Sequence, residues 1–243
     1  HGDPGRSDDA GQQRVDILRV GKPRRRIQRG GITVAHAGLR EAAADPGVRV
    51  LVLGHTGGTF CAGADLSEAS GGDPFESTAA RTRELATVLR AIVESPLPVV
   101  AAIDGHVRAG GLGLVGACDI AVAGPRSTFA LTEARIGVAP AIISLTLLPK
   151  LSPRAAARYY LTGETFSAER AAEIGLITLA AEDVTAAVDG LVADLGRGSP
   201  QGLAASKALT TASILAGFDR DAERLAVESA RLFISDEARE GML

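Results

Sequence analysis

The stretch VVAAIDGHVRAGGLGLVGACDI, residues 99–120, decides the fold. It opens with five apolar residues, which is typical of a short strand buried on both faces. Asp104 and Gly105 turn the chain, and residues 110–118 predict a helix built from small residues. Small residues at such a turn let the backbone come close to another group. The stretch therefore predicts one strand–loop–helix unit of an α/β protein.

Strands and helices alternate on both sides of this stretch. We expect a helix over residues 32–44, with Leu39 and Ala43 on one face, a buried strand over 48–53 and an amphipathic helix over 78–94. Further strands are expected over 120–123 and 128–131. Helices should follow over 153–161, 168–174, 184–195, 200–215 and 219–234. Ser152 and Ser199 each precede a proline, as N-caps do. The pattern indicates an α/β core followed by a helical C-terminal part.

Length and composition fit one large core with an appended region. The chain has 243 residues, of which 46% are apolar. Residues 1–13 are polar and glycine-rich, and we interpret them as a disordered tail or the remnant of a tag. Residues 14–190 are expected to form the α/β core, and residues 191–243 the C-terminal helical region.

Charge and cysteine content exclude several classes of protein. The net charge of −3 predicts no general affinity for nucleic acid or for an anionic membrane. No apolar run approaches the ~20 residues that span a bilayer. The two cysteines, Cys61 and Cys118, provide no disulfide framework, which favours a reducing, cytoplasmic compartment.

Two glycine-rich loops carry the candidate chemistry. They are FCAGADL, residues 60–66, and DGHVRAGGLGL, residues 104–114, and each follows a strand. Both would aim free N–H groups outward, and the second would do so at a helix N-terminus, where the dipole favours negative charge. Side by side, such loops would make an oxyanion hole. Either loop alone is better explained as a tight strand–helix turn, and neither has dinucleotide or P-loop spacing.

Together and in this order, the loops resemble the enoyl-CoA hydratase/isomerase (crotonase) superfamily. The resemblance runs over residues 48–207 and includes FALTEARIG, residues 129–137, and RYYLTGE, residues 158–164. It implies a crotonase-like spiral of ββα units whose C-terminal helical region mediates trimerisation. We expect a homotrimer or hexamer, because residues 219–234 place an apolar stripe on one helix face, formed by Ala222, Leu225, Ala226, Ser229, Leu232 and Phe233.

The resemblance also implies the site residues. The backbone N–H groups of Ala64 and Gly110 would polarise the thioester carbonyl of an acyl-CoA, and Glu133 would be the acid/base. The substrate-binding residues would be Ala62, Ala64, Asp65, Leu66, Ser67 and Gly110. The resemblance implies no cofactor, because CoA is part of the substrate. No spacing of histidines or cysteines predicts a metal site.

One departure leaves the reaction open. Hydratases of the family carry a first glutamate where this chain has Gly113. Two carboxylates activate water readily, whereas one base is enough to shift a double bond. The segment GVAPAIIS, residues 137–144, resembles bacterial enzymes of the methylglutaconyl-CoA hydratase type. We therefore expect an enoyl-CoA hydratase acting on a 2-enoyl-CoA. The alternatives are an enoyl-CoA delta isomerase with a single glutamate base, and a non-catalytic trimer that binds CoA esters.

Four other residues could take part in chemistry. Cys61 reads as a small apolar thiol, since no base lies beside it in sequence. His106 reads as a turn residue, and Ser144 as structural, because it lacks the context of a nucleophile elbow. Lys207 is interpreted either as a solvated helix lysine or as a contact to a CoA phosphate.

Overall fold

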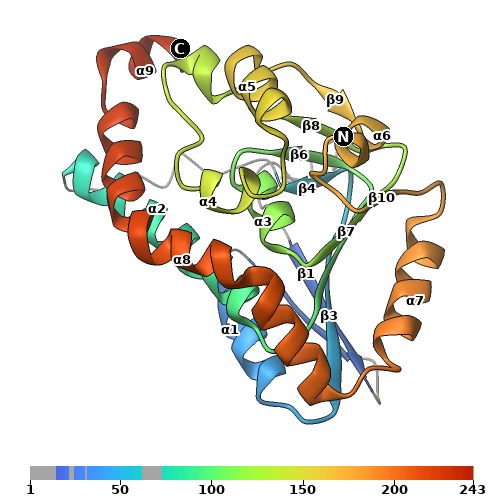
Figure 1. The fold of residues 1–243 in the computed structure, drawn as a ribbon. Coiled ribbons are helices and arrows are strands. Elements are labelled where there is room, and N and C mark those ends of the chain that lie inside the picture. The colour runs from blue at the N-terminus through green and yellow to red at the C-terminus, as the bar shows by residue number, and fades with distance from the viewer. Residues whose placement is uncertain (1–14, 22–24, 31, 62–72, 243) are drawn as a thin grey trace, which may run out of the picture.

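Two sheets frame the molecule (Figure 1). The computed structural model describes residues 15–21, 25–30, 32–61 and 73–242, and side chains from residue 37 onward. The larger sheet has the order β10-β7-β5-β3-β1-β2, in which β10, β7, β5 and β3 are parallel and β1 is antiparallel to both neighbours. Its strands are β1 (Val15–Gly21), β2 (Arg25–Gly30), β3 (Val48–His55), β5 (Val99–Ile103), β7 (Ile120–Ala123) and β10 (Leu179–Ala180).

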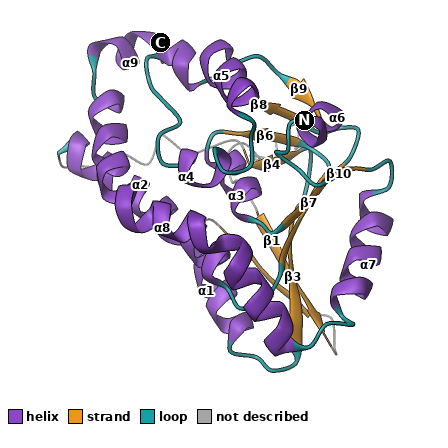
Figure 2. Ribbon diagram, viewed as in Figure 1, coloured by secondary structure: helices purple, strands orange, loops and turns teal. Residues whose placement is uncertain are grey.

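The smaller sheet has the order β4-β6-β8-β9. Its strands are β4 (Thr59–Cys61), β6 (His106–Arg108), β8 (Thr128–Ala130) and β9 (Phe166–Ser167). The helices alternate with the strands and then dominate the C-terminal third (Figure 2). They are α1 (Ile32–Ala43), α2 (Pro74–Glu94), α3 (Gly110–Ala117), the 3-10 turn η2 (Glu133–Ile136), α4 (Ser144–Leu147), α5 (Pro153–Thr162), α6 (Ala168–Glu173), α7 (Val184–Leu195), α8 (Pro200–Phe233) and α9 (Asp236–Gly241).

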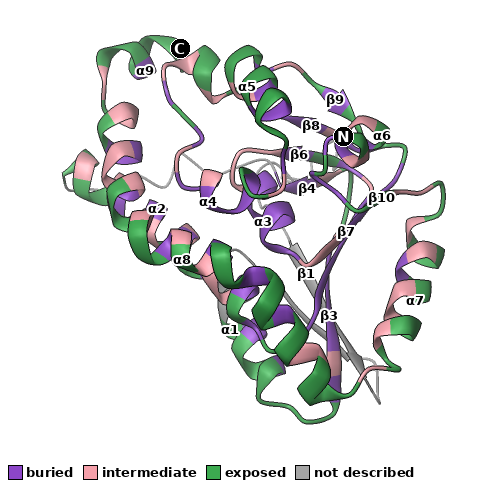
Figure 3. Ribbon diagram, in the orientation of Figure 1, coloured by how far each residue is buried: buried purple, intermediate pink, exposed green. Residues whose placement is uncertain are grey.

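The apolar run of strand β3 is continuous because both faces of the strand are buried. Leu51 and Leu53 belong to the large core on the side of α1 and α2, and Val50 and Val52 to a smaller cluster that includes Val188 of α7. Because neighbouring side chains on a strand point to opposite faces, helices cover both faces of this sheet. Figure 3 shows the buried strands between the two layers of helices.

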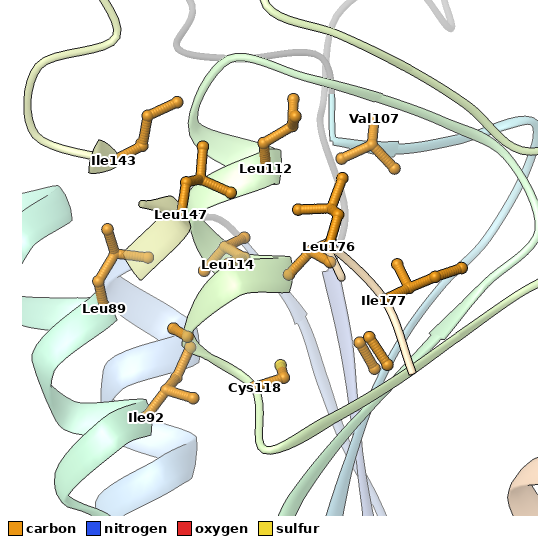
Figure 4. Close-up of a cluster of buried hydrophobic side chains, with 14 of the residues drawn as sticks. Leu89, Ile92, Val107, Leu112, Leu114, Cys118, Ile143, Leu147, Leu176 and Ile177 are labelled. Atoms are coloured by element: carbon orange, nitrogen blue, oxygen red, sulfur yellow. The ribbon is translucent and has the colours of Figure 1, made fainter. Parts of the chain in front are cut away.

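Helix α3 lies at the centre of the molecule. Leu112 and Leu114 of α3 pack among Leu89 of α2 and Leu147 of α4 (Figure 4). The hydroxyl of Thr146 on α4 donates to the Gly113 carbonyl at 2.9 Å. This packing sets the position of α3 and of the loop that precedes the helix.

Most predicted elements are confirmed, with the bounds given above. The hydroxyls of Ser152 and Ser199 cap α5 and α8 as expected, accepting from the N–H groups of Ala155 and Gly202. In α1, Leu39 is buried, but Ala43 is exposed and Ala42 takes its place. Strands β1 and β2 were not predicted, since their sequences lack the apolar run of a buried strand.

Two boundaries differ for identifiable reasons. Helix α2 begins at Pro74 instead of residue 78, because the Asp73 carboxylate caps it by accepting from the Phe75 N–H. The predicted helices 200–215 and 219–234 are one helix, α8. A glycine inside a helix costs only about 1 kcal/mol, and the burial of Ile214 and Phe218 on either side of Gly217 outweighs that cost.

The apolar stripe expected at a trimer interface is partly covered within the chain. Ala226 and Ser229 are buried, while Leu225, Leu232 and Phe233 are half-buried. The trimer therefore stays a prediction. Among the helices that the structure describes, none is long and apolar enough to cross a membrane.

Candidate active site

Three parallel strands of the smaller sheet end at one edge. Strand β4 pairs with β6, and β6 with β8, with Arg108 beside Ala130. Because the strands are parallel, the segments that follow them leave from the same edge of the sheet. Gly110 comes two residues after β6 and Glu133 three residues after β8. Ligands of open α/β sheets characteristically bind at the carboxyl ends of the strands.

The loop after β6 holds a strained residue at the start of α3. Ala109 is the N-cap, with φ 44° and ψ −124°, and it is the only non-glycine residue with positive φ among those described. Gly110 follows as the first residue of the helix, and the first N–H groups of a helix have no acceptor within it. Leu85 of α2 packs beside Gly110. The loop thus places the Gly110 N–H at a helix N-terminus, where it has no acceptor within the helix.

The strain at Ala109 predicts that glycine is better tolerated there. Ala109→Gly is expected to raise the free energy of unfolding by about 1 kcal/mol, because glycine adopts positive φ without the clash of a Cβ. For a chain of this size the melting temperature should rise by roughly 2–4 °C. The matched control is Ala117→Gly at the other end of α3, which should destabilise by about 1 kcal/mol. Thermal unfolding that shows a loss of stability for both variants would contradict the strain.

The loop after β4 begins against the second loop. A Cβ at Gly111 would stand 2.7 Å from the Cβ of Cys61 and 3.0 Å from its carbonyl oxygen. Only glycine allows this approach, which brings the end of β4 directly onto the first turn of α3. The residues predicted to follow it in the site, namely Ala62, Ala64, Asp65, Leu66 and Ser67, lie outside the described residues.

Glu133 is a half-buried carboxylate at the start of η2. Its Oε2 is buried and has no hydrogen-bond partner among the described residues. Burial raises the pKa of Glu133, an effect partly offset by a hydrogen bond from its own backbone N–H. A carboxyl group with a raised pKa is suited to taking and returning a proton near neutral pH.

Two neighbouring helices hold the turn that carries Glu133. Arg135 donates to the Thr162 carbonyl at the end of α5 at 3.0 Å. Gly137 ends η2 in the left-handed conformation, with φ 75°. A Cβ there would stand 2.8–3.0 Å from backbone atoms of Glu237 and Ala238 in α9. The position of Glu133 is therefore fixed by α5 on one side and by α9 on the other.

The place of the family's first glutamate is filled by an isoleucine. A Cβ at Gly113 would stand 2.6 Å from Cγ2 of Ile143 and 3.2 Å from Leu89. Sequence reasoning noted the missing glutamate but not that Ile143 occupies its space. The segment PAII was the only local signal. A glutamate introduced at Gly113 has no room, so it could not restore a second carboxylate.

The contact between Gly113 and Ile143 can be tested in two backgrounds. Gly113→Ala is expected to lower the free energy of unfolding by about 1–3 kcal/mol, because overpacking a filled core costs that much. In an Ile143→Ala background the loss should be clearly smaller, because the contact with Cγ2 at 2.6 Å is gone, although the Cβ of residue 143 stays at 3.0 Å and Leu89 at 3.2 Å. Equal losses in both backgrounds, measured by urea unfolding, would show that Ile143 does not fill this space.

The structure overturns both interpretations of Lys207. Its ammonium group is buried, forms an ion pair with Asp119 at 2.7 Å, and donates to the carbonyls of Ile92 at 2.8 Å and Leu97 at 3.0 Å. All three of its N–H donors are therefore used within the chain. Lys207 is neither a solvated lysine nor a contact to a CoA phosphate. It joins α8 to the end of α2 and the start of β5.

The other residues considered lie where structural roles place them. Cys61 is buried, and His106 is exposed with its Nδ1 2.7 Å from the Thr128 hydroxyl. The Ser144 hydroxyl donates to the Ala141 carbonyl. Among the described residues, no three histidine, cysteine, aspartate or glutamate side chains gather as a metal site requires.

Known proteins share both the sequence and the fold of this chain. The model of the family Enoyl-CoA hydratase/isomerase matches residues 31–242. The structure of an enoyl-CoA hydratase from Mycobacterium avium is 75% identical with a TM-score of 0.83, over 87% of this chain and 81% of that one. An enoyl-CoA hydratase from Shewanella pealeana is 32% identical with a TM-score of 0.69, over 87% and 81%.

One matching relative has a specific substrate in its name. The (E)-benzylidenesuccinyl-CoA hydratase of Thauera aromatica is 32% identical over 168 residues, which are 68% of this chain and 62% of that protein. The α/β fold with a helical C-terminal region is thus confirmed as the crotonase fold that the sequence predicted. The chain belongs to the enoyl-CoA hydratase/isomerase family of enzymes.

Proposed function

We propose that this enzyme is an enoyl-CoA hydratase, which adds water across the double bond of a 2-enoyl-CoA thioester. The observation that carries the proposal is the edge of the smaller sheet. There the helix N-terminus at Gly110 and the half-buried carboxylate of Glu133 follow adjacent parallel strands. One group suits a developing oxyanion and the other suits proton transfer.

Backbone N–H groups would activate the substrate. The thioester oxygen accepts hydrogen bonds from Ala64 and Gly110, and Ala62, Asp65, Leu66 and Ser67 lie along the CoA moiety. As water attacks the β carbon, negative charge moves onto the thioester oxygen to give an enolate. One preorganised donor to such an oxygen is worth about 3–4 kcal/mol in the barrier. The reaction needs no cofactor, because CoA is part of the substrate.

One carboxylate is enough to balance the protons. Glu133 takes a proton from water as the water oxygen bonds to the β carbon. The neutral carboxyl then returns a proton to the α carbon, the enolate collapses, and Glu133 is ionised again. The product has gained one water, and the enzyme is unchanged. Because one group performs both transfers, the proton and the hydroxyl add to the same face of the double bond.

The same site also suits a second reaction. Since Ile143 fills the space of a second carboxylate, a single base could move a proton from one carbon to another and shift the double bond. The alternative function is therefore a delta isomerase. A non-catalytic trimer that binds CoA esters is the other alternative, and Oε2 of Glu133, buried without a partner among the described residues, argues against it.

A panel of substrates tests the proposal. The purified enzyme is incubated with 2-enoyl-, 3-enoyl- and glutaconyl-type CoA esters, and hydration and double-bond shift are followed by chromatography of the products. Hydration of at least one 2-enoyl-CoA is expected. Double-bond shift alone would replace the hydratase by the isomerase. The absence of any turnover, together with binding of acetoacetyl-CoA by calorimetry, would favour the non-catalytic alternative.

A further inference from the structure

Two adjacent tyrosines on α5 differ in their hydrogen bonding. Tyr159 is buried, and the centroid of its ring lies 4.2 Å from that of Phe166. Its hydroxyl accepts a hydrogen bond from Arg170 at 2.9 Å. The hydroxyl of Tyr160 is also shielded from solvent, but it has no partner among the described residues. Tyr159 is thus accounted for by packing, and Tyr160 is not.

Tyr160 lies beside the turn that carries Glu133. The end of α5 packs on η2, since Arg135 donates to the Thr162 carbonyl and Gly163 approaches the Leu131 carbonyl. Burial raises the pKa of Tyr160, and the charge of Glu133 raises it further. Tyr160 and Glu133 therefore lie on elements that pack together, near enough for the charge of Glu133 to act on the phenol, and no hydrogen bond joins them among the described residues.

Two buried polar atoms without partners among the described residues, on elements that pack together, are unusual. Buried polar atoms nearly always have a hydrogen-bond partner, and leaving one without a partner costs about 1–3 kcal/mol. The Tyr160 hydroxyl and Oε2 of Glu133 both carry this penalty. A small polar molecule bound between them would satisfy both groups. Because its pKa is raised, the phenol stays neutral and can hold such a molecule without removing its proton.

We propose that Tyr160 is a positioning residue that holds the reacting water for Glu133. This inference rests on the proposed hydratase function. It assigns to a phenol the positioning task that a second carboxylate would have in a two-glutamate site, whose place Ile143 fills here. The water donates one hydrogen to Glu133 and is oriented by the hydroxyl of Tyr160.

Tyr160→Phe tests the assignment, because only the hydroxyl is lost. We expect kcat for hydration to fall about 10- to 100-fold, which is the effect of losing one hydrogen bond that supports a charged group. KM and the affinity for acetoacetyl-CoA should stay within a few-fold. The acid limb of the pH profile should move to higher pH, because ionised Glu133 loses a water that was held against it.

Tyr159→Phe is the matched control on the same helix. It loses the bond to Arg170, so it should lower the melting temperature and leave kcat and the pH profile unchanged. Equal hydration by Tyr160→Phe and the wild type would overturn the role of Tyr160 alone. Loss of acetoacetyl-CoA binding together with kcat would overturn it as well, since the effect would then be structural. A wild type that hydrates no 2-enoyl-CoA would instead overturn the proposed function, and the water-holding role with it.

Discussion

Replacing Glu133 by glutamine is expected to lower kcat by about 10²–10⁴-fold, the usual contribution of general acid–base catalysis. Glutamine has the same shape but cannot accept a proton. Binding should change by no more than a few-fold, because the proposed contacts to the thioester oxygen come from backbone N–H groups that the substitution leaves in place. The expected result is therefore a loss in kcat with little change in KM.

Steady-state kinetics on the best substrate, with calorimetry of acetoacetyl-CoA, measures both quantities. The control is Glu223→Gln, which removes an exposed carboxylate paired with Arg83 and should leave kcat unchanged. If Glu133→Gln keeps full activity, Glu133 is not the base. His106 would be a poor substitute, because it is exposed and bonded to Thr128.

The raised pKa of Glu133 gives the same variant a signature in stability. A carboxyl group whose folded-state pKa is raised contributes stability that is fully present below its unfolded value, about 4.5. That contribution is lost as the pH rises through the folded-state value. Glutamine does not titrate, so the stability of Glu133→Gln relative to the wild type should improve with rising pH. Melting temperatures from pH 4 to pH 8 test this sign.

Replacing Lys207 by methionine is expected to lower the free energy of unfolding by about 3–5 kcal/mol. Removing one partner of a buried ion pair leaves the other charge uncompensated. Among the described residues, the carboxylate of Asp119 would keep the N–H of Val99, which donates to it at 2.8 Å. The carbonyls of Ile92 and Leu97 would also lose their donor.

Chemical unfolding at a fixed protein concentration measures the loss. The double variant Lys207→Met/Asp119→Asn should recover part of it, because a neutral asparagine no longer carries a buried charge and can still accept from Val99. The control is Arg220→Met on the same helix, where a side chain that is 73% exposed should contribute less than about 1 kcal/mol. Equal effects of Lys207→Met and Arg220→Met would show that Lys207 is solvated after all.

Interactions between residues close in sequence were enough to predict most strands and helices of this protein. The apolar run of β5, the turn at Asp104 and Gly105, and the caps Ser152 and Ser199 each act through residues close in sequence. The patterns that revealed them are therefore short. Glu133 could be named for a related reason, because its segment keeps the spacing of a known motif. The continuation of helix α8 through Gly217 was not predicted, since the burial that stabilises the helix there depends on distant partners.

The character of the candidate site was decided by contacts between distant segments. Ile143 fills the space at Gly113 from 30 residues further along the chain, and Lys207 reaches the Ile92 carbonyl across 115 residues. Tyr160 comes near Glu133 because α5 packs on η2. Such contacts leave no periodicity or spacing in the sequence. The sequence alone therefore determined the fold and the position of Glu133. Only the tertiary structure decided that Ile143 fills the space beside Gly113 and that Tyr160 comes near Glu133, because side chains far apart in the chain meet only when the elements pack.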